Sequence, residues 1–153
     1  MKTFTNFLKV IAIVVVIGIA AFAPAKVHAQ QSVNNTKWAR QMRDEDSRMM
    51  RDAWDIVTFE VYEFGTSNFT YYYIYFCTDR ETRQLMSLMG LQHNVPEKQR
   101  EGTYRQSGNT INLNGAEPLS INADGRLTSS DGRTVYTKVP SLSVPDFPDS
   151  LKR

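Results

Sequence analysis

The side chains best suited to binding a metal ion are Met86, Met89 and His93, which follow the pattern Met-x-x-Met-x-x-x-His. Thioether and imidazole groups together suit Cu(I). Two methionines three positions apart on a short helix are explained more simply as flexible residues that fill a gap in a core. Copper is therefore the weaker of the two interpretations, and we expect no cofactor.

The sequence offers little for nucleophilic or acid–base catalysis. Beyond the leader described below, histidine is limited to His93, in a polar stretch. The single cysteine, Cys77, stands in a predicted strand with an acidic residue two positions on, a setting that does not favour a thiolate. Glu60 and Glu63 are three positions apart on a predicted strand, so they point to opposite sides and cannot converge on one bond. These observations predict a protein that is not an enzyme.

Residues 54–76 predict a β-hairpin, because two runs rich in aromatic and β-branched residues flank the turn sequence GTSN. A turn that pairs Phe64 with Phe69 sorts the side chains onto two faces. One face carries Val57, Phe59, Val61, Tyr72, Ile74 and Phe76, and the other carries Thr58, Glu60, Tyr62, Tyr71, Tyr73 and Tyr75. We expect the first, apolar face to build the core of a half-buried sheet.

The second face is the candidate binding surface, and we call it the tyrosine face. It consists of Tyr62, Tyr71, Tyr73 and Tyr75 together with Glu60. Aromatic rings with polar tips are enriched at recognition surfaces. Two alternatives stay open: a helix from the preceding segment covers this face, or the face is exposed to a partner, which could be a second copy of the chain.

Residues 36–53 (TKWARQMRDEDSRMMRDA) predict an amphipathic helix that follows a lead-in beginning at Gln30. Its large apolar residues recur at four- and seven-residue steps, which places them along one side of a helix. They are Trp38, Met42, Met49 and Ala53. We expect this side to pack against the rest of the domain.

A second, shorter helix is predicted directly after the hairpin. Thr78 and Glu81 fit a capping box at its start, and Gly90 fits its end. Leu85, Leu88 and Met89 fit the inward stripe of this helix. The following residues, 91–101, predict a polar loop.

The second half of the chain predicts an antiparallel meander, because turn signals recur every seven to nine residues. They are Ser107-Gly108-Asn109, Asn114-Gly115, Asp124-Gly125 and Asp131-Gly132. In the first hairpin, any loop of even length places Tyr104, Ile111 and Leu113 on one face. Together with residues 54–76 this predicts a mainly β domain, a small barrel of about seven strands over residues 54–139. The proline-rich tail, 140–153, predicts an extended strap or a loose end.

This half of the chain resembles the small exported bacterial lipocalin-like barrels. The family hairpin G-x-Y-x-x-x-G-N-x-I-x-L is matched here by Gly102, Tyr104, Gly108, Asn109, Ile111 and Leu113. A closing strand with Gly132, Tyr136 and Lys138 follows, its spacing one residue longer than the family pattern. The resemblance is sharpest over residues 102–139. It implies a barrel fold and brings no catalytic residues.

The first 29 residues have the organisation of a secretory signal peptide: a basic start, an apolar run over residues 10–23, and small residues before Gln30. The apolar run is short for a membrane span, so we expect no stable span after cleavage. Loss of the three leader lysines leaves 15 basic against 16 acidic residues, which gives no support to a nucleic-acid partner. We expect an exported chain, periplasmic or extracellular, with about 124 residues in one domain.

The sequence therefore predicts a binding protein without catalytic activity, an exported lipocalin-like barrel. Its partner would be a small apolar ligand or a protein of the cell envelope. The alternative is a structural or interaction protein of the envelope with a solid core and no ligand cavity. The volume left inside the barrel separates these two hypotheses.

Overall fold

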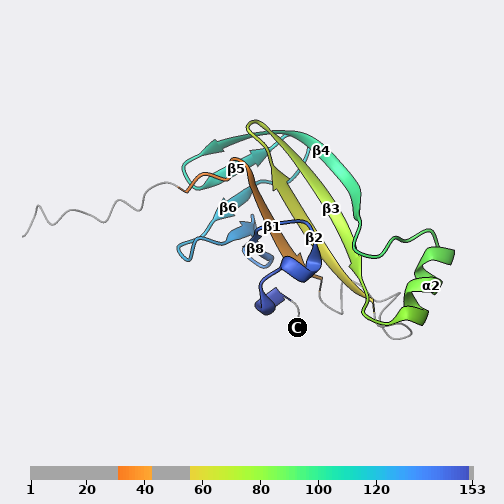
Figure 1. The fold of residues 1–153 in the computed structure, drawn as a ribbon. Coiled ribbons are helices and arrows are strands. Elements are labelled where there is room, and N and C mark those ends of the chain that lie inside the picture. The colour runs from red at the N-terminus through yellow and green to blue at the C-terminus, as the bar shows by residue number, and fades with distance from the viewer. Residues whose placement is uncertain (1–30, 43–55, 152–153) are drawn as a thin grey trace, which may run out of the picture.

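The computed structural model describes residues 31–42 and 56–151, which form a closed antiparallel β-barrel and one α-helix (Figure 1). The strands follow one another around the barrel in chain order, and the last strand pairs with the first. Their bounds are β1 Thr36–Gln41, β2 Val57–Phe64, β3 Asn68–Phe76, β4 Pro96–Ser107, β5 Thr110–Leu113, β6 Leu119–Ile121, β7 Leu127–Ser129 and β8 Val135–Val139. Helix α2, Arg80–Leu88, lies between β3 and β4. The prediction of a mainly β, closed barrel is confirmed, with eight strands in place of about seven.

The predicted register of the first hairpin is confirmed. Strand β2 pairs with β3 so that Phe64 faces Phe69 and Val57 faces Phe76. The predicted turns of the second half are also present: Gly108, Gly115, Gly125 and Gly132 have positive φ values. Glycine adopts this left-handed conformation without the steric cost that a Cβ atom brings.

The helix predicted over residues 36–53 is wrong at its start, because residues 36–41 form strand β1. Residues 43–53 lie outside the described residues. Trp38 and Ala39 are neighbours in sequence and both are fully buried, one on each side of the strand. The barrel thus begins at Thr36 and not at residue 54. The four-residue spacing of apolar residues led to the wrong prediction of a helix. Strand β1 is buried on both faces, so its sequence lacks the alternation of apolar and polar residues that marks most strands.

Three details around α2 also differ from the prediction. The helix is capped by Asp79, whose carboxylate accepts a hydrogen bond of 2.7 Å from the Thr82 N–H, and not by Thr78. Met86 is the helix residue that is fully buried. The three residues predicted to point inward, Leu85, Leu88 and Met89, are exposed. The predicted polar loop 91–101 ends at Pro96, where β4 begins.

The inside of the barrel is filled by a cluster to which all eight strands contribute, and we call it the inner cluster. Its buried members are Val33, Trp38, Phe64, Phe69, Tyr104, Ile111, Leu113, Leu119, Ile121, Leu127 and Tyr136. Tyr104, Ile111 and Leu113 lie on one face, as predicted. Tyr62 packs against this cluster from β2. The tyrosine face of the hairpin is therefore its inward face, and the prediction that the opposite face fills the barrel is wrong.

The apolar face of the hairpin points outward and is buried by the tail. Phe59, Val61 and Ile74 pack with Val144 and Phe147, two buried residues of the tail. The rings of Phe59 and Phe147 meet edge to face at 5.3 Å between centroids. The tail contains two 3-10 turns, η1 Val144–Asp146 and η2 Asp149–Leu151, and crosses the front of the sheet in Figure 1. Of the two predicted alternatives, the tail is a strap.

Within the part of the chain that the structure describes, we find no helix with the length and apolar character needed to cross a membrane.

The contact between Phe147 and the outer face predicts that the tail contributes to stability. Truncation of a buried phenylalanine removes its burial and leaves a cavity, so Phe147→Ala should lower the free energy of unfolding by about 3 kcal/mol. Ser150→Ala changes an exposed residue of the same tail and is the control; it should shift stability by less than about 0.5 kcal/mol. Urea denaturation followed by circular dichroism measures both. Equal effects of the two variants would show that the tail is not held by packing.

Candidate functional site

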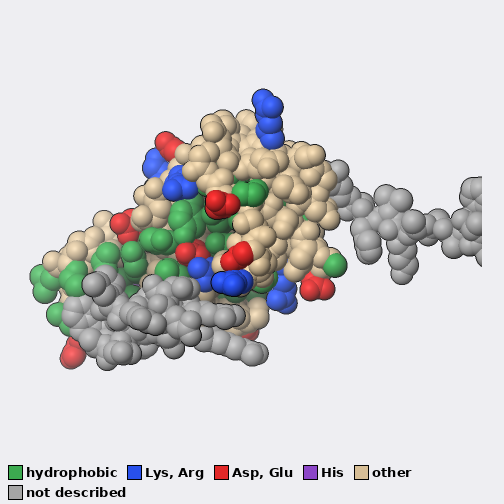
Figure 2. Space-filling view, turned by 180° about the vertical axis from the view of Figure 1, so that it is seen from behind, with side chains coloured by type: hydrophobic (Ala, Val, Ile, Leu, Met, Phe, Trp, Pro, Cys, Tyr) green, Lys and Arg blue, Asp and Glu red, His purple; other side chains and the backbone are tan. Residues whose placement is uncertain are grey.

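The barrel is uneven in length, and this leaves one end of its inner wall less covered than the other. Strands β2, β3 and β4 have 8, 9 and 12 residues, whereas β5, β6 and β7 have 4, 3 and 3. Strand β4 pairs with β5 over Tyr104–Ser107, while its first half, Glu97–Glu101, is exposed. We call the end near α2 the helix end. Seen from behind, the surface carries a band of hydrophobic side chains with charged side chains among them (Figure 2).

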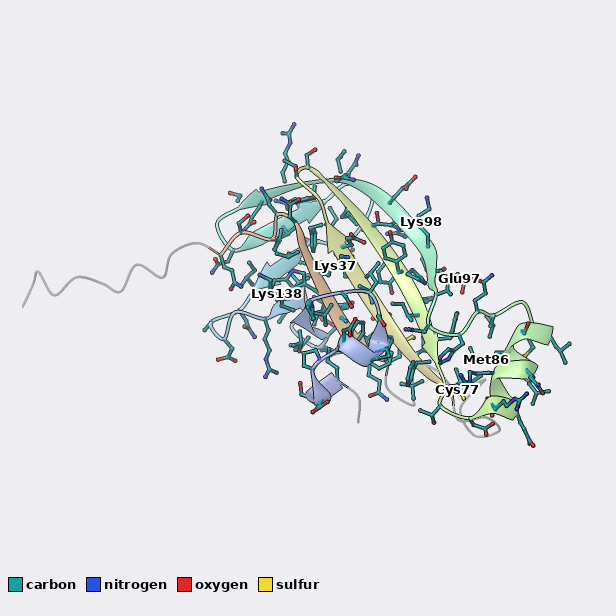
Figure 3. The ribbon with its side chains drawn as sticks, in the orientation of Figure 1. Lys37, Cys77, Met86, Glu97, Lys98 and Lys138 are labelled. Atoms are coloured by element: carbon teal, nitrogen blue, oxygen red, sulfur yellow. The ribbon has the colours of Figure 1, made fainter. Side chains whose placement is uncertain are left out.

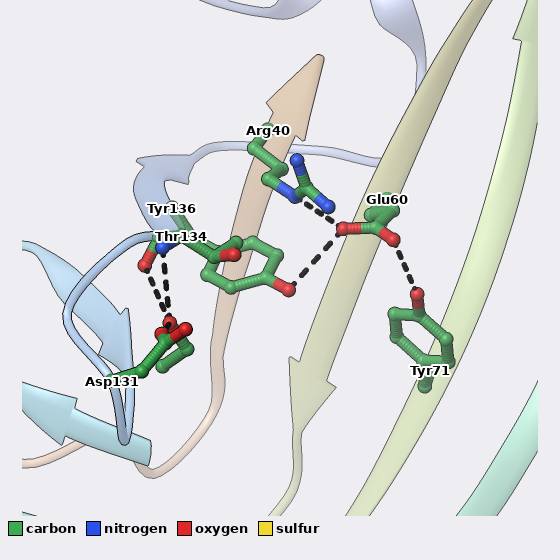
Figure 4. A network of polar contacts seen from close by, with 7 residues as sticks. Arg40, Glu60, Tyr71, Asp131, Thr134 and Tyr136 are labelled. Carbon is green, nitrogen blue, oxygen red and sulfur yellow. Dashed lines mark hydrogen bonds and ion pairs between the residues drawn. The ribbon is translucent and has the colours of Figure 1, made fainter. Parts of the chain in front are cut away.

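A buried carboxylate lies on the inner wall of the barrel. Glu60 is 6% exposed and accepts hydrogen bonds from three side chains (Figure 4). The Arg40 Nε–H and the Tyr136 hydroxyl donate to Oε2, the latter at 3.3 Å. The Tyr71 hydroxyl donates to Oε1 at 2.7 Å. These donors come from β1, β3 and β8. One carboxylate on β2 therefore connects the first strands of the barrel with its last strand, β8, where the barrel closes.

Aromatic rings surround this carboxylate. The Tyr62 ring lies 4.8 Å from that of Tyr71 and 5.2 Å from that of Tyr136, measured between centroids. Tyr71 in turn meets Tyr73 at 5.5 Å. The Arg40 guanidinium carbon lies 5.9 Å from the Tyr136 centroid, within the range of a cation–π contact. The result is an aromatic wall with a paired charge at its centre.

Burial and the Glu60 charge keep these phenols protonated. Burial raises the pKa of Tyr71 and of Tyr136 far above the ordinary value of 10.0, and the Glu60 carboxylate raises both further. The pKa of Tyr62 is raised by the same two causes. A neutral phenol donates a hydrogen bond to a carboxylate, whereas a phenolate would repel it, so the protonated phenols are the form that holds Glu60 in place.

The predicted binding residues are brought together only in part. Tyr62, Tyr71 and Glu60 meet in the network just described, and Tyr73 touches it through Tyr71. Tyr75 lies farther toward the helix end, where it lines a hollow of about 310 Å³ with Val95, Pro96 and Glu97. Burial, then the charge and hydrogen bond of Glu97, raise the pKa of Tyr75 to about 12.

The predicted tyrosine face lies on the inner, concave side of the sheet. The helix predicted over residues 36–53 as its cover does not form over residues 36–41, and residues 43–53 lie outside the described residues. Tyr62, Tyr71, Tyr73 and Tyr75 are half-buried on the concave side of the sheet, and Glu60 is buried. Two central members of the site, Arg40 and Tyr136, were not predicted as site residues. Arg40 lies in a segment for which a helix was predicted, so its place opposite Glu60 was missed, and Tyr136 is 76 residues from Glu60 in sequence.

The three copper candidates differ in burial. Met86 is fully buried in a small cluster with Ile56 and Cys77 at the helix end, where Figure 3 shows Met86 near Cys77. Met89 is 41% exposed. His93 uses its Nδ1 to accept a hydrogen bond of 3.2 Å from the Cys77 N–H. Burial, then the Arg83 charge, lowers the pKa of His93. Met86 therefore has the gap-filling role that the sequence also allowed.

In the described part of the chain, no three His, Cys, Asp or Glu side chains are grouped so that they could hold a metal ion. Glu60 and Glu63 point to opposite sides of β2, as predicted: Glu63 forms an ion pair of 3.5 Å with Lys37 on the outer side. Glu60 and Glu63 therefore do not converge on one bond.

Comparison with models of known protein families, with curated proteins and with solved structures finds no match to this chain. The closed eight-stranded antiparallel meander is consistent with a lipocalin-like fold. The agreement with the family resemblance in the sequence is thus one of fold.

The Arg40–Glu60 pair predicts a strong dependence of stability on the arginine. Arg40→Met removes the cation but leaves Glu60 buried, so it should cost about 3–5 kcal/mol of unfolding free energy. Adding Glu60→Gln removes the unpaired charge and should recover more than about half of that loss. The Lys37–Glu63 pair on the same two strands is the matched control, and Lys37→Met should cost about 1 kcal/mol or less. A double variant as unstable as Arg40→Met alone would contradict the role of the charge.

The raised tyrosine pKa values predict loss of stability in alkali. Below about pH 10 the phenols are neutral in both states, so the shift has no effect on stability. Above it the unfolded chain ionises first, because the folded pKa values of Tyr71 and Tyr136 are raised, and stability falls as the pH rises. Tyrosinate absorbance followed during an alkaline titration should show these phenols ionising only as the protein unfolds. Tyr71→Phe and Tyr136→Phe should each reduce that late step.

Proposed function

We propose that this chain is an exported, non-enzymatic β-barrel protein that binds a small ligand or a protein partner in the cell envelope. Binding takes place on the tyrosine face, at the helix end of the inner wall. The export signal in residues 1–29 supports the location, and the barrel fold supports a binding role.

The observation that carries the proposal is the half-buried row of tyrosines beside the buried Glu60. Tyr71, Tyr73 and Tyr75 are partly exposed on the concave wall, at the end where β5, β6 and β7 do not extend. Binding sites typically combine aromatic walls with a few convergent polar groups. The network of Arg40, Glu60 and Tyr136 holds these groups in one geometry, which lowers the cost of ordering them on binding.

A second candidate, a structural or interaction protein with a solid core, is favoured by one observation. The inner cluster fills the half of the barrel near the β2–β3 turn with large side chains from all eight strands. A ligand would therefore not sit in that half. In this second candidate the helix end of the barrel contacts the surface of another protein, whereas in the first it binds a small molecule.

The proposal predicts that material bound to the native protein depends on the tyrosine face. The full chain is expressed in its own host, recovered from its own compartment and examined by native mass spectrometry. The expected mass lacks residues 1–29 and includes a bound molecule. Tyr73→Ser should lose most of that molecule. Tyr72→Ser is the matched control, because Tyr72 lies on the same strand but on the outer face, and it should keep it.

The outcomes separate the alternatives. A small molecule lost only in Tyr73→Ser supports ligand binding, and a stoichiometric protein lost in the same way supports the interaction protein. Recovery of the uncleaved chain inside the cell would overturn export. A bare monomer, or equal loss in both variants, would overturn binding through the tyrosine face.

A further inference from the structure

A second hollow lies on the other side of the sheet, between the outer face of the β2–β3 hairpin and the tail. Its volume is about 180 Å³. It is lined by Val57, Phe59, Phe76, Cys77, Thr78, Val144 and Pro145. Five of these seven residues have hydrocarbon side chains, and none of the seven carries a charge. We call it the strap pocket.

The strap pocket exists because the tail covers only part of an apolar surface. Phe147 covers Phe59 directly, but toward the helix end Val57 and Phe76 are only half-buried. Apolar residues at these outward positions would be unfavourable if they faced water alone. The sequence thus continues the apolar outer face beyond the area that the tail packs against.

The roof of the strap pocket is fixed in place by hydrogen bonds. The Val144 N–H donates to Asn94 Oδ1 at 2.9 Å, and the Asn94 side-chain amide donates to Ser143 Oγ at 3.3 Å. Asn94 is itself held by a bond of 2.7 Å from its N–H to the Tyr75 carbonyl. The tail is therefore tied to the loop before β4 on one side of the pocket and packed through Phe147 on the other.

We propose that the strap pocket binds a small uncharged aromatic molecule. An apolar cavity of about 150 Å³ is known to stay dry and to admit benzene, so the strap pocket has room for one ring. A charged ligand would lose hydration without gaining a partner from this lining. Phe59 and Phe76 provide ring contacts. The exposed Thr78 hydroxyl can serve a polar substituent at the mouth.

This site is independent of the proposed function. It uses the outer face of the hairpin, whereas the tyrosine face is the inner one. Binding in the strap pocket and binding on the tyrosine face can therefore be tested separately, and either one can be disproved without the other.

The test uses the purified full chain and fluorobenzene as the probe. Fluorine NMR should show saturable binding to the unchanged protein. Val57→Phe places extra bulk in the pocket and should weaken binding about tenfold, since it displaces the volume of several methylene groups. Val135→Phe makes the same change on β8, outside the strap pocket, and should leave binding unchanged. Circular dichroism verifies that both variants are folded.

A second measurement follows thermal unfolding of the same proteins. Fluorobenzene should raise the midpoint temperature of the unchanged protein, because a ligand that binds the folded chain stabilises it, and the rise should be lost in Val57→Phe. Should Val57→Phe fail to fold, Thr78→Trp closes the mouth from an exposed position and should have the same effect on binding. The proposal is overturned if the unchanged protein shows no saturable binding, or if Val57→Phe and Val135→Phe weaken it equally.

Discussion

The buried carboxylate of Glu60 is the interaction on which the arrangement of this barrel depends. A charge removed from water must be paired and hydrogen-bonded, because an unpaired buried charge costs several kcal/mol. Here Arg40 supplies the charge, and Tyr71 and Tyr136 supply the remaining bonds. Arg40 lies directly opposite Glu60 on the neighbouring strand β1, and Tyr71 lies on β3, so these two bonds form within the β1–β2–β3 part of the sheet. The Tyr136 bond comes from β8 and forms only when the first and last strands have paired, so the network that spans the closing strands also fixes the wall of the candidate site.

Both faces of the β2–β3 hairpin carry large apolar side chains, so each face must pack against another part of the chain. This explains why the tail folds back onto the barrel. The inward face of β2 and β3 is covered by the inner cluster, and the outward face is covered by the tail through Val144 and Phe147. The tail is thus part of the folded domain. Its incomplete cover leaves the strap pocket, just as the short β5, β6 and β7 leave the tyrosine face partly open. Each candidate site thus lies where a part of the hairpin extends beyond the strands or the tail that pack against it.

Much of the fold was predictable because the signals are local. The turn sequences, the register of β2 with β3 and the side shared by Tyr104, Ile111 and Leu113 follow from glycine conformation and from alternation along a strand. The predictions that failed concern segments whose environment comes from distant residues. Residues 36–41 bury one apolar residue on each side, Trp38 in the inner cluster and Ala39 against the tail, and such a segment has no strand-like alternation to detect.

The sequence by itself determined the two faces of the hairpin, since alternation and the turn fix which residues share a side. Which face points inward was decided only by the tertiary structure. Both faces carry large apolar groups, so their composition does not distinguish them. Arg40 lies opposite Glu60 on β1 and shares its side whichever way the hairpin faces. Only inside the closed barrel does Glu60 also meet the Tyr136 hydroxyl, from a strand 76 residues away in sequence. Long-range partners of a buried charge are a property of the closed barrel, and no local pattern encodes them.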